Sequence, residues 1–196
     1  MKQHQHAKII AQRIIHSRLY KHSRHIALYL STDGEVDLAF LINKLHSYSK
    51  KCYLPVILSR QHAIMVFAPY DKHTRLKKNC FGIFEPVYQK KQLRTARQMD
   101  LVLAPLVGFD EQGNRIGMGG GFYDRALQHL KPTNAHSLKQ QTVESRFMKS
   151  RFIKPRFLKP KVIGIAHELQ KVAKLQSQSW DITLDAIATE KRLSFF

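Results

Sequence analysis

Short apolar segments alternate with segments of helical periodicity along most of the chain, and this alternation limits the fold more than any other feature. Apolar runs typical of buried strands occupy residues 25–31, 52–58, 63–68, 101–107, 162–166 and 186–189. Helical spacing predicts helices over residues 7–20, 36–46, 122–130 and 168–175. Strands that alternate with helices predict an α/β fold, with a largely parallel, open, Rossmann-like sheet flanked by helices.

Residues 131–161 interrupt this alternation. Within them an Arg-Phe-x-Lys unit occurs three times at a spacing of five residues, which fits neither a helix nor a strand. This stretch is strongly basic and contributes to a net charge of +19. We interpret it as a flexible basic insertion within a single domain of residues 1–196. The alternative is a strip that binds RNA, because Arg pairs with phosphates and Phe stacks on bases.

The compartment and the class of partner follow from what the sequence lacks. No apolar run approaches the ~20 residues that a membrane helix needs, and the His-rich start has no apolar core of a secretory signal. Cys52 and Cys80 are too few for a disulfide scaffold, so we expect both to be reduced packing residues. We therefore predict a cytoplasmic protein with no membrane partner. The charge suits a polyanion or an anionic substrate and does not choose between them.

A glycine-rich loop follows the apolar segment at 101–107 and precedes the predicted helix at 122–130. Four of the five residues from Gly117 to Gly121 are glycine, which lets the backbone approach a ligand closely. Arg115 offers a guanidinium suited to phosphate oxygens, and the loop ends at a helix N-terminus. Asp124 fits such a site if Mg²⁺ bridges its carboxylate and the phosphates. The alternative is a glycine-rich turn without a ligand.

Two familiar phosphate-binding motifs are absent from this loop. No Gly-Lys-Ser/Thr follows the glycines, which excludes a P-loop. A dinucleotide fingerprint would need glycine where Phe122 stands. The loop therefore predicts an anion site of another kind.

The loop and its flanks, GFDEQGNRIGMGGGFYDRAL, resemble the signature of 5-formyltetrahydrofolate cyclo-ligases. The segment IALYLSTDGEVDLAFLI is similar to the early strand, turn and helix of that family. Shorter segments occur in the family's order: KCYLPVI, MVF, FGIFEP, VIGIAHELQ and WDITLDAIAT. The resemblance covers most of the chain outside residues 131–161.

The resemblance implies a folate enzyme of one-carbon metabolism. Such enzymes convert 5-formyltetrahydrofolate to 5,10-methenyltetrahydrofolate with ATP and Mg²⁺, and they release ADP and phosphate. We expect the chain to act as a monomer. Two alternatives stay open: an inactive ligase scaffold that binds RNA or another polyanion, and another ATP-dependent phosphotransfer enzyme on a related fold.

The resemblance also implies site residues. Arg115 and Tyr123 would be catalytic, and Asp124 and Asp181 would hold the metal ion. The ATP-binding residues would be Arg115, Ile116, Gly117, Met118, Gly119, Gly120, Gly121, Phe122 and Tyr123. The folate-binding residues would be Leu30, Glu35, Met118, Gly119, Gly120, Gly121 and Phe122.

Each of these residues also has a purely structural interpretation. Leu30 could be core, Glu35 a helix-cap carboxylate, and Asp181 a cap or surface acid. Asp185 competes with Asp181 for the metal role. His167 and Gln170 follow a predicted strand, where we expect a solvated loop. The histidines show no HExxH or paired Cys/His spacing, so the sequence predicts no transition-metal site.

Two departures from the family pattern affect the nucleotide site. Many relatives have Tyr where this chain has Phe122, which keeps a ring for stacking and lacks the hydroxyl. Relatives also begin with an additional basic stretch that contacts ATP. Lys2, Lys8 and Arg13 are candidate substitutes here, so either the start is misassigned or ATP is bound more weakly.

Overall fold

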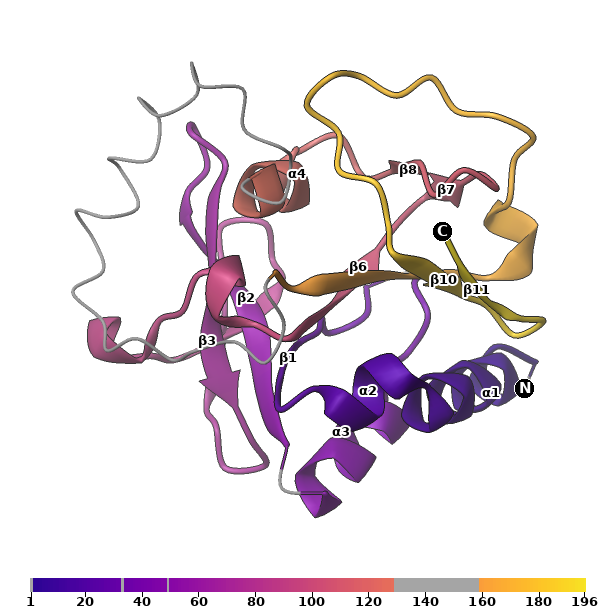
Figure 1. Cartoon of the computed structure of the whole chain (residues 1–196). Helices are drawn as coiled ribbons and strands as arrows, with labels where there is room; N and C mark the ends of the chain where they lie inside the picture. The colour runs from indigo at the N-terminus through magenta and orange to yellow at the C-terminus, as the bar shows by residue number, and fades with distance from the viewer. Residues whose placement is uncertain (1, 33, 49, 129–158) are drawn as a thin grey trace.

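The computed structural model describes residues 2–32, 34–48, 50–128 and 159–196, and it is organised around one seven-stranded sheet (Figure 1). The strand order is β11-β10-β9-β6-β1-β2-β3. The strands are β1 (His25–Ala27), β2 (Lys51–Ser59), β3 (Ile64–Tyr70), β6 (Leu101–Pro105), β9 (Lys161–Ile165), β10 (Ala186–Ala188) and β11 (Leu193–Phe195). The five central strands are parallel, whereas β3 and β11 pair antiparallel at the edges. The predicted open, largely parallel sheet is confirmed.

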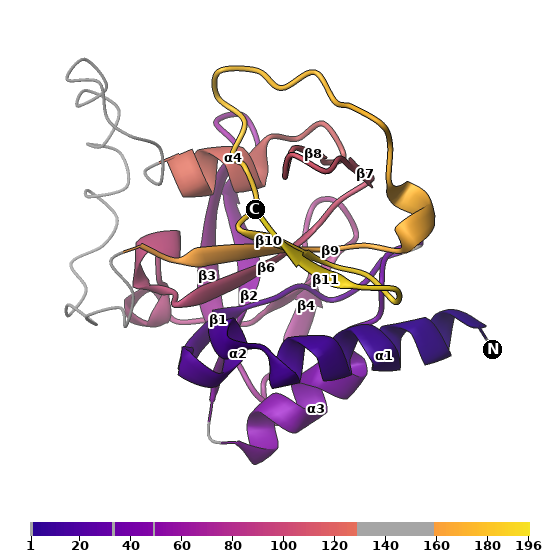
Figure 2. The same cartoon turned by 45° about the vertical axis from the view of Figure 1, so that its right-hand side comes forward.

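Helices cover both faces of this sheet (Figures 1 and 2). The helices α1 (Lys2–His16), α2 (Arg18–His22) and α3 (Ala39–Ser47) lie on one face, and α4 (Phe122–Leu127) lies on the other. The described residues also contain 3₁₀ turns at Lys90–Gln92, Ala96–Gln98 and Glu168–Gln170. Two small hairpins stand apart from the main sheet, and they are β4 (Leu76–Lys78) with β5 (Phe84–Pro86) and β7 (Gly108–Phe109) with β8 (Arg115–Ile116).

Side-chain alternation along the parallel strands creates two separate apolar cores. On β6, Leu101 and Leu103 pack on the face covered by α1 and α3. Val102 and Ala104, which alternate with them, pack on the face covered by α4. On α1, four buried residues follow the i, i+3, i+4, i+7 spacing of one helical face: Ala7, Ile10, Ala11 and Ile14. This apolar face is what holds the N-terminal helix against the sheet.

Several predicted element bounds were wrong, each for a local reason. The predicted helix over 7–20 splits because Ser17 caps α2, its hydroxyl accepting a hydrogen bond from the Tyr20 N–H at 3.1 Å. The predicted helix over 168–175 is only a 3₁₀ turn, Glu168–Gln170. Strand β4 was not predicted, and it pairs with β5. The edge strand β11 was not predicted.

Strand β1 is shorter than its apolar run, and one cysteine differs from expectation. Regular pairing ends at Ala27, although the Leu28 N–H still donates to the Tyr53 carbonyl at 3.0 Å. Cys52 is buried and free, as expected. Cys80 is also free but exposed, so its interpretation as a packing residue was wrong.

The predicted insertion at 131–161 lies outside the described residues except for its last three, of which Lys161 begins β9. Residues 129–130 of the predicted helix at 122–130 also lie outside them. Within the described part of the chain, no helix has the length and apolar character to cross a membrane.

Candidate active site

The parallel strands end at one common edge of the sheet, and the loops that leave this edge carry the predicted site residues. Strand β1 leads to Leu30 and Glu35, β6 leads to the glycine-rich loop, β9 leads to His167, and β10 leads to Glu190. Ligands of open α/β sheets bind outside this carboxyl edge. The topology therefore gathers segments that are far apart in sequence.

Asp110 organises the base of the glycine-rich loop. Its buried carboxylate accepts hydrogen bonds from the Gln112 and Asn114 N–H groups, both at 2.9 Å, and from the Asn114 side chain at 2.8 Å. It also accepts from the Leu175 N–H at 3.0 Å, which ties a distant loop to the hairpin. Burial alone would raise the pKa of Asp110, but these hydrogen bonds outweigh it and lower the pKa. Sequence analysis did not single out this structural residue.

Arg115 and Asp124 form an ion pair across the loop. Arg115 Nη2 lies 2.7 Å from Asp124 Oδ1, and the arginine side chain is only 3% exposed. Asp124 Oδ1 also accepts from the Ile182 N–H at 3.1 Å. Arg115 Nε is buried and has no hydrogen-bond partner among the described residues. The pair thus joins β8 to α4 while leaving arginine donor capacity for a ligand.

Tyr123 lies close to both Arg115 of the glycine-rich loop and Glu35 of the loop after β1. Its ring centroid is 5.9 Å from the Arg115 guanidinium carbon. Burial raises the pKa of Tyr123, the Glu35 carboxylate raises it further, and Arg115 lowers it. The electrostatic influence of Glu35 places the loop after β1 near α4. Tyr123 therefore stays protonated at neutral pH and can act as a hydrogen-bond donor.

Glu35 and Leu30 take part in the structure of their own loop. Glu35 Oε2 accepts from the Thr32 N–H at 2.8 Å, so one oxygen closes the turn. Leu30 lines a cavity of about 280 Å³, together with Leu38, Ile42 and Tyr70. A half-buried position at the wall of a cavity is compatible with ligand contact as well as with packing.

The glycines give the loop a backbone that other residues rarely adopt. Gly119 and Gly121 have φ of +82° and +63°, and no atom would touch a Cβ at either position. Met118 is 81% exposed, so this part of the loop is open. Phe122 packs edge-to-face on Phe81 with centroids 5.9 Å apart. An open loop beside an aromatic pair can accept a flat ligand.

The two C-terminal aspartates differ in their surroundings. Asp185 is tied to the sheet, because it pairs with Lys161 at 2.6 Å and accepts from the Val162 N–H at 2.9 Å. Asp181 accepts from the Gln178 N–H at 2.7 Å within its own turn. Its neighbour Ile182 is the residue that donates to Asp124. Asp181 thus stands next in sequence to a residue that contacts Asp124, whereas Asp185 is engaged by β9.

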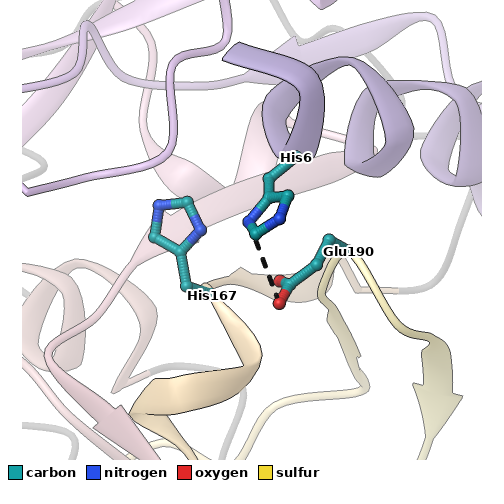
Figure 3. Close-up of side chains that lie close together, drawn as sticks. All are labelled: His6, His167 and Glu190. Carbon is teal, nitrogen blue, oxygen red and sulfur yellow. Dashed lines mark ion pairs between the residues drawn. The ribbon is translucent and has the colours of Figure 1, made fainter. Parts of the chain in front are cut away.

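His167 is buried, so the expectation of a solvated loop histidine was wrong. Its ring lies beside His6 and Glu190, as Figure 3 shows. Burial lowers the pKa of His167, with Glu190 raising it and His6 lowering it. Sequence analysis missed this group because its members lie in three distant segments. The available signal was a histidine and a glutamate that each follow the end of a strand.

Comparisons with known proteins agree with the signature in the loop. A sequence model of the 5-formyltetrahydrofolate cyclo-ligase family matches residues 1–190. The 5-formyltetrahydrofolate cyclo-ligase of Haemophilus influenzae is 33% identical over 184 residues, which cover 94% of this chain and 85% of the relative. That of Escherichia coli K12 is 35% identical over 168 residues, which cover 86% of this chain and 79% of the relative.

Two solved 5,10-methenyltetrahydrofolate synthetases share the fold. The Aquifex aeolicus structure superimposes with a TM-score of 0.73 at 24% identity and covers 99% of this chain and 82% of its own. The Mycoplasma pneumoniae structure gives a TM-score of 0.64 at 22% identity, and the match covers 96% of this chain and 87% of that structure's chain. The family match over residues 1–190, with these two relatives, shows that the chain belongs to the 5-formyltetrahydrofolate cyclo-ligase family.

Proposed function

We propose that the chain converts 5-formyltetrahydrofolate to 5,10-methenyltetrahydrofolate with MgATP, at the site formed by Glu35, Arg115, Tyr123 and Asp124. The observation that carries this proposal is the Arg115–Asp124 ion pair, 2.7 Å long, which holds the glycine-rich loop against α4 beside Tyr123. The family match identifies the reaction, and the geometry suggests how these residues divide it.

In this proposal the ATP phosphates lie along residues 115–123. The unpartnered Nε of Arg115 offers a donor, and the exposed glycines allow close approach to backbone N–H groups. Helix α4 has six residues, so we assign the phosphate contact to the loop and Arg115 rather than to a helix dipole. Arg13 is one of the candidate substitutes for the family's basic N-terminal stretch. Its guanidinium donates a hydrogen bond to the backbone carbonyl of Glu190 at 3.1 Å.

The donor set fits Mg²⁺, which prefers oxygen ligands and usually keeps several waters. The hydrogen bonds of Asp124 within the described residues all fall on Oδ1, so Oδ2 is available to a cation. Asp181, next to Ile182, would supply the second carboxylate. When bound, the ion would neutralise charge on the ATP phosphates.

The folate would lie between the loop after β1 and the glycine-rich loop. Glu35 keeps Oε1 available while Oε2 holds the Thr32 N–H, so it can accept a hydrogen bond from the folate. Leu30 would pack against the folate from the cavity wall. The residues from Met118 to Phe122 would border it on the other side.

The chemistry needs ATP because a formamide oxygen is a poor leaving group. The formyl oxygen attacks the γ-phosphorus and ADP leaves, which converts the oxygen into a phosphate ester. N10 of the same folate then attacks the formyl carbon, its N–H proton passes to solvent, and phosphate departs as the five-membered ring closes. The attack is intramolecular, so the protein mainly positions groups and stabilises charge. Arg115 would stabilise the transferring phosphoryl group, and the neutral Tyr123 would donate a hydrogen bond.

The test follows the absorbance of the methenyl product after mixing the protein with 5-formyltetrahydrofolate and MgATP. We expect turnover that requires both ATP and Mg²⁺ and that Asp124→Asn reduces about 100-fold or more. Asp71→Asn is the matched control, because Asp71 is an exposed loop aspartate on another part of the surface. Turnover in the Asp124→Asn variant equal to that of the control would contradict the assignment.

We further propose that the enzyme acts as a monomer in the cytoplasm, with 5-formyltetrahydrofolate and ATP rather than nucleic acid as its favoured partners. The two free cysteines support a reducing compartment. Light scattering coupled to size exclusion would measure the mass directly, and a mass near 22.8 kDa is expected.

A further inference from the structure

Three metal-binding side chains meet on the β9 and β10 side of the carboxyl edge. His6 comes from the first half of α1, His167 follows β9, and Glu190 follows β10 (Figure 3). Each offers one ligand atom, and the three atoms lie within 4.8 Å of one another. Among the described residues, this is the group of three or more such side chains that comes this close together.

The ligand set is that of a zinc site with an open position. Two imidazoles and one carboxylate, with water as the fourth ligand, suit Zn²⁺ and related transition-metal ions. Bonds of about 2.0–2.2 Å in a tetrahedron bring ligand atoms to roughly 3.3 Å from one another. His6 Nδ1 and Glu190 Oε1 are 3.9 Å apart, and all three ligand atoms lie within 4.8 Å of one another, so the ligand atoms would have to approach one another by about 1.5 Å or less to bind the ion. His6 is 35% exposed on a helix surface, and its ring can move by this amount.

Neighbouring groups already orient one of the three ligands, Glu190. Glu190 Oε2 accepts the Glu168 N–H at 3.0 Å, which leaves Oε1 directed at His6. Glu168 is held in turn by the Thr189 hydroxyl at 2.6 Å and by Arg192 at 3.3 Å. Supporting hydrogen bonds of this kind fix metal ligands and are part of functional metal sites.

A simple ion pair does not account for the whole group. It explains His6 and Glu190, which face each other at 3.9 Å. It does not include His167, which is a buried residue. The ring of His167 instead lies 5.8 Å from that of His6 at a tilt of 53°. A central cation would use all three side chains.

We propose that His6, His167 and Glu190 bind one divalent transition-metal ion of the zinc class, with water as the fourth ligand. This site differs from the proposed Mg²⁺ site in its residues and in its chemistry, because imidazole suits zinc whereas the all-carboxylate pair Asp124 and Asp181 suits magnesium. It does not depend on the proposed reaction. A bound ion would connect the start of α1 to the ends of β9 and β10.

The experiment uses the full chain, free of any affinity tag and stripped of metal. Zn²⁺ is titrated calorimetrically in the presence of excess Mg²⁺, and thermal unfolding is recorded with and without Zn²⁺. His6→Gln and Glu190→Gln remove one ligand each, and Gln at 190 can still accept from the Glu168 N–H. His4→Gln is the matched control, since His4 is an exposed histidine on the same helix.

We expect the wild type and His4→Gln to bind one Zn²⁺ with the same Kd and to gain the same rise in Tm. His6→Gln and Glu190→Gln should each weaken this binding about tenfold or more and lose the rise in Tm. Co²⁺ in place of Zn²⁺ should give the intense visible absorption of a four-coordinate ion in the wild type and in His4→Gln, and not in His6→Gln or Glu190→Gln. Equal affinity and equal Tm shifts in all four proteins would overturn the site, as would no binding to the wild type.

Discussion

The two halves of the carboxyl edge differ in how closely their charged and polar side chains contact one another. On the β6 side, Arg115 and Asp124 touch at 2.7 Å and the Ile182 N–H completes the contact, so the protein supplies both charges. On the β9 and β10 side, His6, His167 and Glu190 stand up to 4.8 Å apart with no direct hydrogen bond joining them among the described residues. The first half is bonded without a ligand, whereas the second surrounds a point where a ligand atom would fit.

The difference shows how one sheet edge can present two chemistries. A guanidinium and a glycine backbone attract anions, and the paired aspartate limits the cost of burying the arginine. Imidazoles with a carboxylate attract a cation instead. If the two halves are independent, a substitution in one should leave the other unchanged, and the following variants test that independence.

The largest effect is expected for Arg115→Ala. It leaves Asp124 without its partner and removes the proposed phosphate contact, so kcat/KM should fall by about 10²–10³-fold. Zn²⁺ affinity of the same variant should match the wild type. Steady-state assays and calorimetry on one preparation measure both quantities. A parallel loss of Zn²⁺ binding would show that the two halves are coupled.

Glu35→Gln should change the KM for folate and not the KM for ATP. It keeps the acceptor for the Thr32 N–H but loses the negative charge offered to the substrate, which corresponds to about a tenfold rise in the folate KM. The KM for ATP should stay near its wild-type value. Initial rates with each substrate varied separately make the measurement, and a larger change in the ATP KM would place Glu35 on the nucleotide instead.

Tyr123→Phe should lower kcat about tenfold through the loss of a hydrogen-bond donor. Because burial and Glu35 raise the pKa of Tyr123, its phenol stays protonated in the fold above pH 10, where an exposed tyrosine ionises. The wild-type pH profile of kcat should therefore show no loss from this group as the pH rises to 10. If an alkaline loss centred below pH 10 appears in the wild type and vanishes in Tyr123→Phe, the protonated role is wrong.

The smallest effect is expected for His6→Gln without added transition metal. His6 belongs to the proposed zinc site and contacts none of the proposed catalytic residues. Turnover with MgATP should be unchanged, and the assay is the methenyl absorbance. Slower turnover at unchanged Tm would extend the active site to the β9 and β10 side.

The sequence was most informative where residues act close together along the chain. The loop from Arg115 to Asp124 could be identified from one continuous segment, and the alternation of apolar runs predicted the parallel sheet. The resemblance, rather than any spacing, pointed to Glu35 and Asp181. Their individual roles stay predictions.

Contacts between distant segments were not predictable from the sequence in the same way. His6, His167 and Glu190 lie near opposite ends of the chain, and only the folded sheet brings them together. The burial of His167 likewise depends on α1 covering the end of β9. By contrast, the break between α1 and α2 had a local signal in Ser17, whose capping preference is well known.

The ion pair between Arg115 and Asp124 has a further consequence for affinity. It closes the glycine-rich segment into a ring, with residues 115 and 124 joined at its base. Flexible glycine backbone loses more conformational entropy than other residues when it becomes ordered. The ring moves much of that loss from the binding step to the folding step, so a nucleotide bound as proposed would meet a loop that is already restrained. In that proposed complex, affinity would depend on this closure as much as on any contact with the ligand.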